Sequence, residues 1–501
     1  MTTVPSTLEA VEMRRQRVLH SLSSERQSEL GQFFTSTETA VLMASMTRIP
    51  ENGKIRILDP GAGSGSLAAS LIVRIVDEYP GVSVHLTVVE VDSTLILPLQ
   101  ETLDDCATLA NLNGMEFSSK LVHGDFIEIG TNFGSKFDLV IMNPPYQKLG
   151  TNSWQRKKMS QLGVDSPNLY AAFMSLGVLN LLPNGQIISI TPRSFTNGTY
   201  FESFRKHLLG NLTLDRIHLF ESRSSLFSDS GVLQENIILV GTKASKSETV
   251  HISTSVGADL EILTHPVSYE EVVQKTDPRK FIRIPSSKND SFVVKTISSL
   301  PATLKELELE VSTGRVVDFR SRDNLSNEER ERSYPLIYPG NLKQGRVQHP
   351  SLSIKKPQWF SRLGYTDYRF LLPSGTYILI KRFSSKEERK RIVASIWSPE
   401  LNGNTQIALD NKLNFIHVNG AGLEESTAKG LCIWLNSTIV DAYFRTFSGH
   451  TQVNASDLRA MPFPDLATLH KMAEGRGYAL PEQEEIDLVV LNQLNISGFI
   501  E

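Results

Sequence analysis

The tetrapeptide Asn143-Pro-Pro-Tyr146 contains the residue types needed to activate a weakly nucleophilic aromatic amine. Proline restricts φ to about −65°, so two prolines in sequence hold the backbone rigidly. We expect the Asn143 side-chain oxygen and the Pro144 carbonyl to form a fixed pair of acceptors. An amine such as adenine N6 is a poor nucleophile because its lone pair is delocalised into the ring, and two acceptors on its N–H bonds would localise that pair. Tyr146 would stack on a base flipped out of its duplex. We therefore predict that Asn143, Pro144, Pro145 and Tyr146 are catalytic.

A glycine-rich turn, Asp59-Pro-Gly-Ala-Gly-Ser-Gly65, joins the apolar run 54–58 to a helical run over 68–77. Glycines at a strand-to-helix turn let the backbone approach a ligand closely, and the start of the helix presents free N–H groups. The spacing differs from the G-x-G-x-x-G of nicotinamide cofactors, and no G-K-[ST] follows for a nucleoside triphosphate. We interpret Asp59, Gly61 and Gly63 as cofactor-binding residues, with a plain tight turn as the alternative.

Two carboxylates follow the next two apolar runs of the chain. Glu90, at the end of the run 84–89, is placed where a carboxylate typically accepts hydrogen bonds from two ribose hydroxyls. Asp125 can accept from an exocyclic amine, and Phe126 can pack on a purine face. These residues describe an adenosine pocket with no phosphate-binding group. They predict S-adenosylmethionine as the cofactor, rather than NAD or ATP, and they imply no metal.

Alternating strands and helices are expected to position these residues. Short apolar runs at 54–58, 84–89, 120–122, 137–142 and 186–190 alternate with helical stretches, which is typical of a doubly wound, mainly parallel α/β sheet. Two later runs, 214–219 and 236–240, could add a hairpin at the sheet edge. Residues 5–30 are expected to form an amphipathic helix with Arg14, Arg15 and Arg17 on its polar side. Beyond about residue 245 the alternation ends, which predicts a second, irregular α+β domain with its boundary between 245 and 300.

Composition excludes several classes of protein. The chain has 501 residues, of which 40% are hydrophobic and 21% charged, so it is globular and not disordered. No apolar run reaches the roughly 18 residues of a membrane span, and the N-terminus does not resemble a signal peptide. Two cysteines exclude a disulfide framework and a cysteine-built zinc site. We expect a soluble, intracellular protein.

Charge is distributed unevenly along the chain. Residues 341–460 contain 16 Lys and Arg against 9 Asp and Glu, a net charge of +7, so the remainder carries −11. A basic third on an acidic body indicates an anionic macromolecular partner, although an ordinary solvated surface would also account for it.

Taken in order, these motifs resemble those of the gamma group of DNA adenine-N6 methyltransferases, and within that group the PstI-type enzymes of restriction–modification systems. The run Gly31-Gln-Phe-Phe-Thr-Ser-Thr-Glu38 is similar to the family's N-terminal motif, which covers the methionine part of the cofactor. The resemblance implies that Thr35 contacts the cofactor, although the usual proline after it is Ser36 here. In family members a second aromatic residue stacks on the flipped adenine from the side opposite the tyrosine. Phe227 is the best match, with Phe220 second and core packing as the alternative.

The resemblance also implies how the chain is divided and what it binds. We expect a helical segment over 1–30, a catalytic domain over 31–250, a linker over 251–300 and a target-recognition domain over 301–501. The last domain would hold double-stranded DNA through basic side chains that neutralise phosphates. These are Lys355, Lys356, Lys381 and Arg382, together with the basic residues of the run 386–391. The same run could instead be a solvated helix face.

Further expectations follow from the resemblance. The protein would act as a monomer in the bacterial cytoplasm and would protect host DNA from a separate restriction endonuclease, with CTGCAG as the suggested target. Two readings compete with it. One is methylation of an RNA amine or a protein glutamine, which enzymes with the same tetrapeptide perform. The other is a catalytically idle DNA-binding protein on a methylase scaffold.

Overall fold

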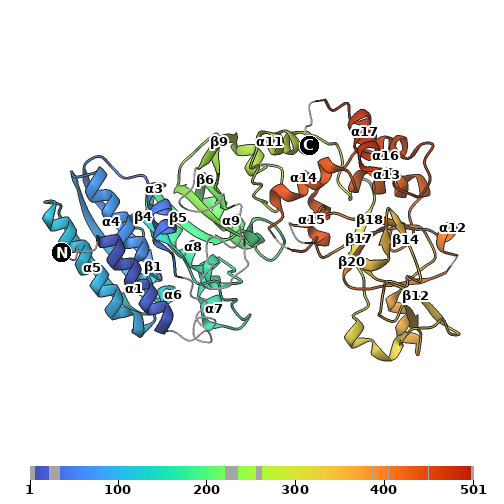
Figure 1. Cartoon of the computed structure of the whole chain (residues 1–501), viewed down its shortest axis with the longest axis horizontal. Helices are drawn as coiled ribbons and strands as arrows, with labels where there is room; N and C mark the ends of the chain where they lie inside the picture. The colour runs from blue at the N-terminus through green and yellow to red at the C-terminus, as the bar shows by residue number, and fades with distance from the viewer. Residues whose placement is uncertain are drawn as a thin grey trace, which may run out of the picture. The chain divides into compact units, whose positions relative to one another are not determined.

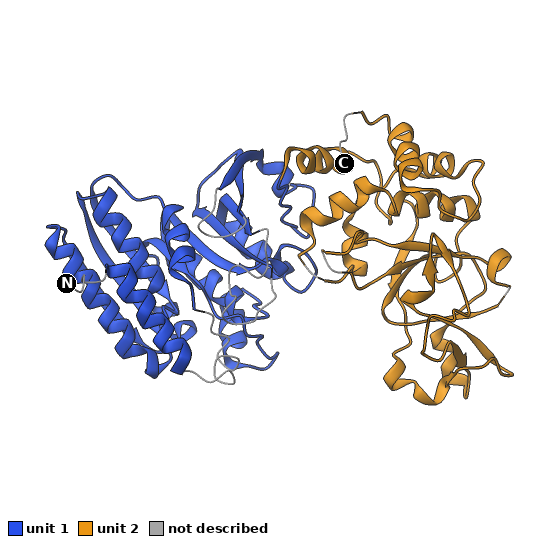
Figure 2. Ribbon diagram, in the orientation of Figure 1, with its two compact units in different colours: residues 1–286 blue, residues 287–501 orange. Residues whose placement is uncertain are grey.

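The structure is a computed structural model that describes residues 6–21, 34–220, 235–255, 262–384, 387–403, 405–449 and 451–497. The chain divides into two compact units, residues 1–286 and residues 287–501 (Figure 2). This division falls inside the expected boundary region of 245–300. Among the described residues, no helix is both long and apolar enough to cross a bilayer.

Unit 1 is built on a sheet that contains nine strands within the described residues, in the order β3-β2-β1-β4-β5-β7-β6-β8-β9. The first five strands of this order are mutually parallel, and β7 is antiparallel to both β5 and β6. The strands are β1 (Gly53–Pro60), β2 (Val82–Glu90), β3 (Phe117–His123), β4 (Phe137–Met142), β5 (Leu181–Pro192), β6 (Leu212–Phe220), β7 (Asn236–Lys243), β8 (Thr249–Ser255) and β9 (Leu263–Ser268). The predicted doubly wound, mainly parallel sheet is confirmed.

Helices cover both faces of this sheet (Figure 1). On one face lie α1 (Thr7–Ser21), α3 (Thr37–Ser45), α4 (Ser66–Glu78) and α5 (Ile96–Leu112), and on the other lie α6 (Phe126–Ile129), α7 (Trp154–Gln161), α8 (Leu169–Asn180) and α9 (Glu202–Asn211). Each face has its own hydrophobic core, and strand residues alternate between the two cores. A sheet buried on both faces needs strands that are apolar along most of their length, which explains the apolar runs of the sequence.

The sheet extends further than the sequence indicated. β6 and β7 do pair antiparallel, but they do not form its edge, because β8 pairs with β6 and β9 follows β8. The stretch 251–300, expected to be a linker, contains most of β8, all of β9, α10 (Tyr269–Val272) and α11 (Lys288–Ser298). In β6, the buried His218 lies between the hydroxyls of Ser253 and Ser255, at 2.9 and 3.0 Å, and burial lowers the pKa of its ring to about 4.

The N-terminal helix differs from expectation in which residues it buries. Arg14 and Arg15 were expected on its polar side, but both are buried, and Arg17 is exposed. Arg14 donates to Glu101 at 2.9 Å and to Asp105 and Thr102 at 2.8 Å, all on α5. Because the acids that pair with Arg14 lie 87 and 91 positions away in the sequence, the helical pattern alone could not reveal this burial. Residues 22–30, the remainder of the expected helix, lie outside the described residues.

Unit 2 is an α+β unit, as predicted for the second domain. Within the described residues it has one sheet ordered β10-β20-β17-β18-β14-β13 and another ordered β11-β15-β12-β19-β16. The first contains β10 (Glu310–Thr313), β20 (Leu413–His417), β17 (Tyr377–Lys381), β18 (Ala394–Trp397), β14 (Arg346–Val347) and β13 (Leu342–Lys343). The second contains β11 (Leu325–Ser326), β15 (Trp359–Ser361), β12 (Ser333–Ile337), β19 (Ile407–Leu409) and β16 (Leu371–Leu372). Besides α11, its helices are α12 (Pro399–Asn402), α13 (Glu425–Leu435), α14 (Thr438–Phe447), α15 (Ala455–Ala460), α16 (Leu466–Ala473) and α17 (Gln483–Gln493).

Candidate active site

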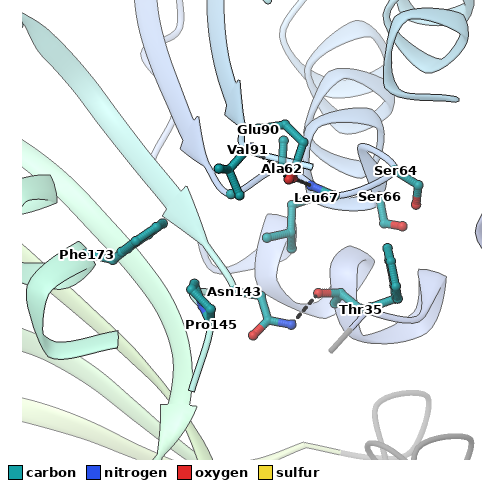
Figure 3. A pocket seen from close by; sticks show the side chains of 13 residues that line it. Thr35, Ala62, Ser64, Ser66, Leu67, Glu90, Val91, Asn143, Pro145 and Phe173 are labelled. Atoms are coloured by element: carbon teal, nitrogen blue, oxygen red, sulfur yellow. Dashed lines mark hydrogen bonds between the residues drawn. The ribbon is translucent and has the colours of Figure 1, made fainter. Parts of the chain in front are cut away.

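A cavity lies at the carboxyl ends of β1, β2 and β4, where the strand order of the sheet reverses (Figure 3). Ligands of doubly wound sheets bind at this position because the loops on its two sides diverge. Six of the predicted site residues line the cavity: Thr35, Gly61, Gly63, Glu90, Asn143 and Pro145. These residues come from four separate stretches of sequence, and the structure brings them together.

The glycine-rich turn forms one wall of the cavity and leads into α4. Gly61, Gly63 and Gly65 all have positive φ, at 74°, 60° and 91°. At Gly65 a Cβ atom would lie 2.8 Å from the Thr102 side chain, so this position tolerates only glycine. The Thr102 hydroxyl accepts from Arg14 and donates to the Ser64 carbonyl, both at 2.8 Å. The turn is therefore held from behind by α5 and, through Arg14, by the N-terminal helix.

Glu90 closes the same wall and is 3% exposed. One carboxylate oxygen, Oε2, accepts from the Gly63 backbone N–H at 2.8 Å. The other, Oε1, accepts from the backbone N–H groups of Val91 and Asp92, each at 2.8 Å. Burial raises the pKa of Glu90, and these three donors oppose that effect. A carboxylate offers about four lone-pair positions, so three are occupied and one, on Oε2, remains for a hydroxyl in the cavity.

Asp59 is buried behind the glycine-rich turn and does not line the cavity. Burial, followed by the nearby charge of Glu90, raises the pKa of Asp59 to about 8, and the Ala68 backbone N–H opposes that shift. Two buried carboxyl groups next to each other are stable when one of them holds a proton. Asp59 therefore shapes the electrostatics of the turn instead of facing the cavity directly.

Asp125 and Phe126 are not among the residues that line the cavity, and the adenine contact expected of them stays a prediction. Asp125 is half-buried at the start of α6, where its carboxylate accepts from the Ile127 backbone N–H at 2.7 Å. Phe126 is a core residue, 2% exposed, and its ring centroid lies 5.1 Å from that of Phe173. It is the Phe173 ring of α8 that reaches the cavity. The sequence contained this residue within an apolar helical run, where nothing distinguished it from core.

The tetrapeptide Asn143–Tyr146 follows β4 and faces the glycine-rich turn across the cavity. The Asn143 amide nitrogen, Nδ2, donates to the Thr35 hydroxyl at 3.0 Å, as the dashed line in Figure 3 marks. The Tyr146 hydroxyl donates to Asn143 Oδ1 at 3.2 Å and lies 3.5 Å from the Ile190 carbonyl. Burial raises the pKa of Tyr146, so this phenol remains protonated. Pro144 is buried beneath the motif.

The aromatic residue opposite Tyr146 stays a prediction. Phe227 lies outside the described residues. Its alternative, Phe220, is 4% exposed at the end of β6, packs against His218 with centroids 4.7 Å apart and belongs to the hydrophobic core. Tyr146 itself packs edge-on against the buried Tyr170 of α8, at a centroid distance of 6.2 Å.

The basic residues of unit 2 have different environments. Lys355 is exposed, whereas Lys356 pairs with Asp318 at 2.5 Å. Lys381 forms an ion pair with Glu388, and Arg382 donates to the Asn411 carbonyl at 3.0 Å. All four retain some exposure and so can face an anionic partner.

Two residues expected to contact phosphates have structural roles instead. Arg391 is 2% exposed, donates to the hydroxyls of Ser384 and Ser448 at 3.1 Å and lies over the Phe444 ring. Lys390 donates to the Asn436 carbonyl. The described part of the run, 387–391, is not helical, so the alternative of a solvated helix face is also wrong.

Comparisons with known proteins show which family the chain resembles. Residues 81–227, which include Glu90 and Asn143, match the family described as Eco57I restriction-modification methylase. The fold resembles the solved type IIL restriction-modification enzyme MmeI in complex with DNA, with a TM-score of 0.55, 12% identity and coverage of 98% of this chain and 74% of that one.

Two curated relatives extend the similarity over nearly the whole chain. Type II methyltransferase M.PstI from Providencia stuartii is 37% identical over 97% of each chain. Type II methyltransferase M.BsuBI from Bacillus subtilis is 39% identical over 91% of each chain. At this identity and coverage, the chain belongs to the type II methyltransferases of restriction–modification systems.

Proposed function

We propose that the chain methylates adenine at N6 in double-stranded DNA at a specific sequence. The observation that carries the proposal is the position of Asn143, whose side-chain amide lies at the edge of the cofactor cavity between Thr35 and Tyr146. An amide oxygen and a proline carbonyl are acceptors for the two N–H bonds of an amine. Adenine N6 carries such an amine at the edge of a ring that Tyr146 can stack against.

The residues of the cavity fit S-adenosylmethionine, the cofactor expected of this family. Glu90 offers an acceptor position toward the cavity, and the Gly61–Gly63 backbone allows close approach of a ligand. Phe34 and Phe173 add aromatic surface to the lining. When bound, this cofactor supplies a methyl group on a positively charged sulfur, and its transfer to the amine leaves a neutral thioether while the amine loses one proton.

The protein's own residues bind and orient the amine instead of moving protons. Asn143 Oδ1 and the Pro144 carbonyl would accept from the two N–H bonds and turn the lone pair toward the cavity. Because the leaving thioether is neutral, the reaction needs no general acid. Water can take the proton that the amine releases, so no strong base is required.

We infer that unit 2 binds the DNA and selects its sequence. Support comes from its net charge of +7 over residues 341–460 and from the exposed side chain of Lys355. A basic surface supplies affinity that is independent of sequence and dependent on salt. If about six phosphates are contacted, affinity for DNA should fall roughly 10³-fold between about 50 and about 200 mM salt.

The biological setting is part of the proposal. We infer that the protein acts as a monomer in the bacterial cytoplasm and protects host DNA from a separate restriction endonuclease. The PstI-type resemblance makes CTGCAG the first sequence to test. The competing substrates, an RNA amine or a protein glutamine, would leave unit 2 without a role.

Sequencing of DNA methylated by the purified protein reports the base and its sequence context together. The proposal expects N6-methyladenine at one recurring site in duplex DNA, which mass spectrometry of the nucleosides confirms. Asn143→Ala should nearly abolish turnover while cofactor and duplex binding stay close to wild type. Methylation of RNA or protein in preference to DNA, N4-methylcytosine as the product, or near wild-type turnover by Asn143→Ala would each contradict it.

A further inference from the structure

The Asn143 side-chain amide is held at both of its ends. Its Nδ2 group donates to the Thr35 hydroxyl at 3.0 Å (Figure 3). Its Oδ1 atom accepts from the Tyr146 hydroxyl at 3.2 Å. Thr35 belongs to the segment before α3, and Asn143 follows β4, more than 100 positions later in the chain. The bond to Thr35 therefore joins two walls of the cavity that the sequence does not place together.

An amide side chain can adopt two orientations that differ by a half-turn and exchange its oxygen with its nitrogen. Only one of them presents Oδ1 to an incoming amine. In the other orientation, the Nδ2 group would face the amine, so the N–H bonds of Asn143 would point at the N–H bonds of the amine. The catalytic use of Asn143 thus depends on an acceptor that takes the amide N–H bonds on the side away from the base.

We propose that Thr35 is a positioning residue whose hydroxyl oxygen accepts from Asn143 Nδ2 and so keeps Oδ1 toward the target amine. This inference rests on the proposed function, because it concerns the same amine and the same acceptor. It assigns to Thr35 a task beyond the cofactor contact implied by the family resemblance. Without DNA, the Tyr146 hydroxyl donates to Oδ1. The target amine would replace this donor when the base enters.

Thr35 is held firmly enough for this task. Thr35 is 6% exposed, and the next residue, Ser36, caps α3 by accepting from the Thr39 backbone N–H. The other end of α3 is tied to α4 by Arg74, which donates to the Ala44 and Thr47 carbonyls. Ser36 stands where the family usually has proline, and its hydroxyl supplies this helix cap, for which proline has no side-chain acceptor.

The test compares Thr35→Val, which keeps the shape but removes the hydroxyl, with Thr35→Ser, which keeps the hydroxyl. Single-turnover methylation is measured at saturating cofactor and DNA, beside the dissociation constant of the cofactor. We expect Thr35→Val to slow the saturated rate about tenfold, the factor that corresponds to one hydrogen bond of ordinary strength, and Thr35→Ser to stay within about threefold of wild type. Thr35→Ala repeats the loss of the hydroxyl in case the valine variant folds poorly.

Ser268→Ala is the matched control, since it removes the side-chain cap of α10, which lies outside the cavity lining. It should lower the melting temperature but leave the saturated rate unchanged. Two results would overturn the inference: a wild-type saturated rate in Thr35→Val, with only cofactor affinity reduced, or an equal loss in Thr35→Ser. The parallel Asn143→Ala reaction separates the two proposals. If Asn143→Ala is inactive while Thr35→Val keeps the wild-type saturated rate, only the role of Thr35 fails, whereas the absence of N6-methyladenine from the wild-type product would remove both.

Discussion

Replacing Glu90 by glutamine would test the carboxylate that lines the cavity, while keeping the size and shape of the side chain. In the wild-type protein, Oε2 accepts one backbone N–H and Oε1 accepts two. A glutamine amide has only one oxygen, so one side of the group must present an NH2 donor to a backbone donor. The less costly orientation keeps the oxygen toward Val91 and Asp92. Gly63 then faces a donor in place of an acceptor.

The size of the effect follows from this arrangement. A hydrogen bond to a charged group contributes about 1.5–3 kcal/mol, and the Gly63 N–H loses such a partner. Part of that loss is offset, because the charge of Glu90 raises the pKa of the buried Asp59 and the substitution removes that repulsion. We expect a decrease of about 1–2 kcal/mol in the free energy of unfolding. The cofactor loses a charged acceptor as well, so its affinity should fall roughly 10- to 100-fold.

Calorimetric titration with S-adenosylmethionine and urea unfolding measure the two quantities independently. Glu116→Gln makes the same chemical change at an exposed position just before β3, at the amino ends of the strands and away from the cavity. Cofactor affinity and stability should both remain unchanged in this variant. Wild-type cofactor affinity in Glu90→Gln would refute the assignment of the cavity as the cofactor site. Unchanged stability would refute the hydrogen-bond accounting at Glu90.

Three further expectations concern other parts of the molecule. Gly65→Ala combines positive φ with a contact of 2.8 Å to Thr102 and should destabilise the protein by about 2–4 kcal/mol in urea unfolding. Gly114→Ala, with positive φ but open space, should cost only the backbone strain of about 1 kcal/mol, and an equal loss in both variants would contradict this reasoning. The pKa of His218 is about 4 in the folded protein and 6.5 in the unfolded chain. Between these values only the unfolded chain takes up a proton, so the free energy of unfolding decreases as the pH is lowered through this window. Relative to His218→Gln, the wild type should lose about 2 kcal/mol between about pH 7 and about pH 5, and a constant difference would show that the ring is not held neutral. Lys355→Gln should weaken DNA binding equally for all sequences and reduce the salt slope by about 1, as gel-shift titrations at several salt concentrations would show, and an unchanged slope would remove Lys355 from the phosphate contacts.

Sequence patterns predicted the catalytic half of the molecule well wherever the signal was local. The end of β1 before Gly61, the end of β2 at Glu90 and the end of β4 before Asn143 all lie where the apolar runs ended. Parallel strands place their carboxyl ends at one edge, so residues at these ends must meet. The convergence of these three residues on one cavity therefore follows from topology alone.

The predictions that were wrong depended on contacts between distant parts of the chain. Arg14 is buried because α5 supplies its acidic partners, and no helical pattern contains that information. Phe173 was missed as a lining residue because its place in the cavity depends on packing against Phe126, which the apolar run around it does not reveal. Arg391 looked like its exposed basic neighbours until its two serine partners were seen.

The path from Arg14 through Thr102 to the Ser64 carbonyl has a consequence for truncation of the chain. A shortened version that begins after α1 would keep every residue that lines the cavity. It would nevertheless leave the Thr102 hydroxyl without its donor and Glu101 and Asp105 without the cation that pairs with both. The N-terminal helix thus supports the glycine-rich turn through Thr102. A deletion of this helix should be expected to affect cofactor binding as well as stability.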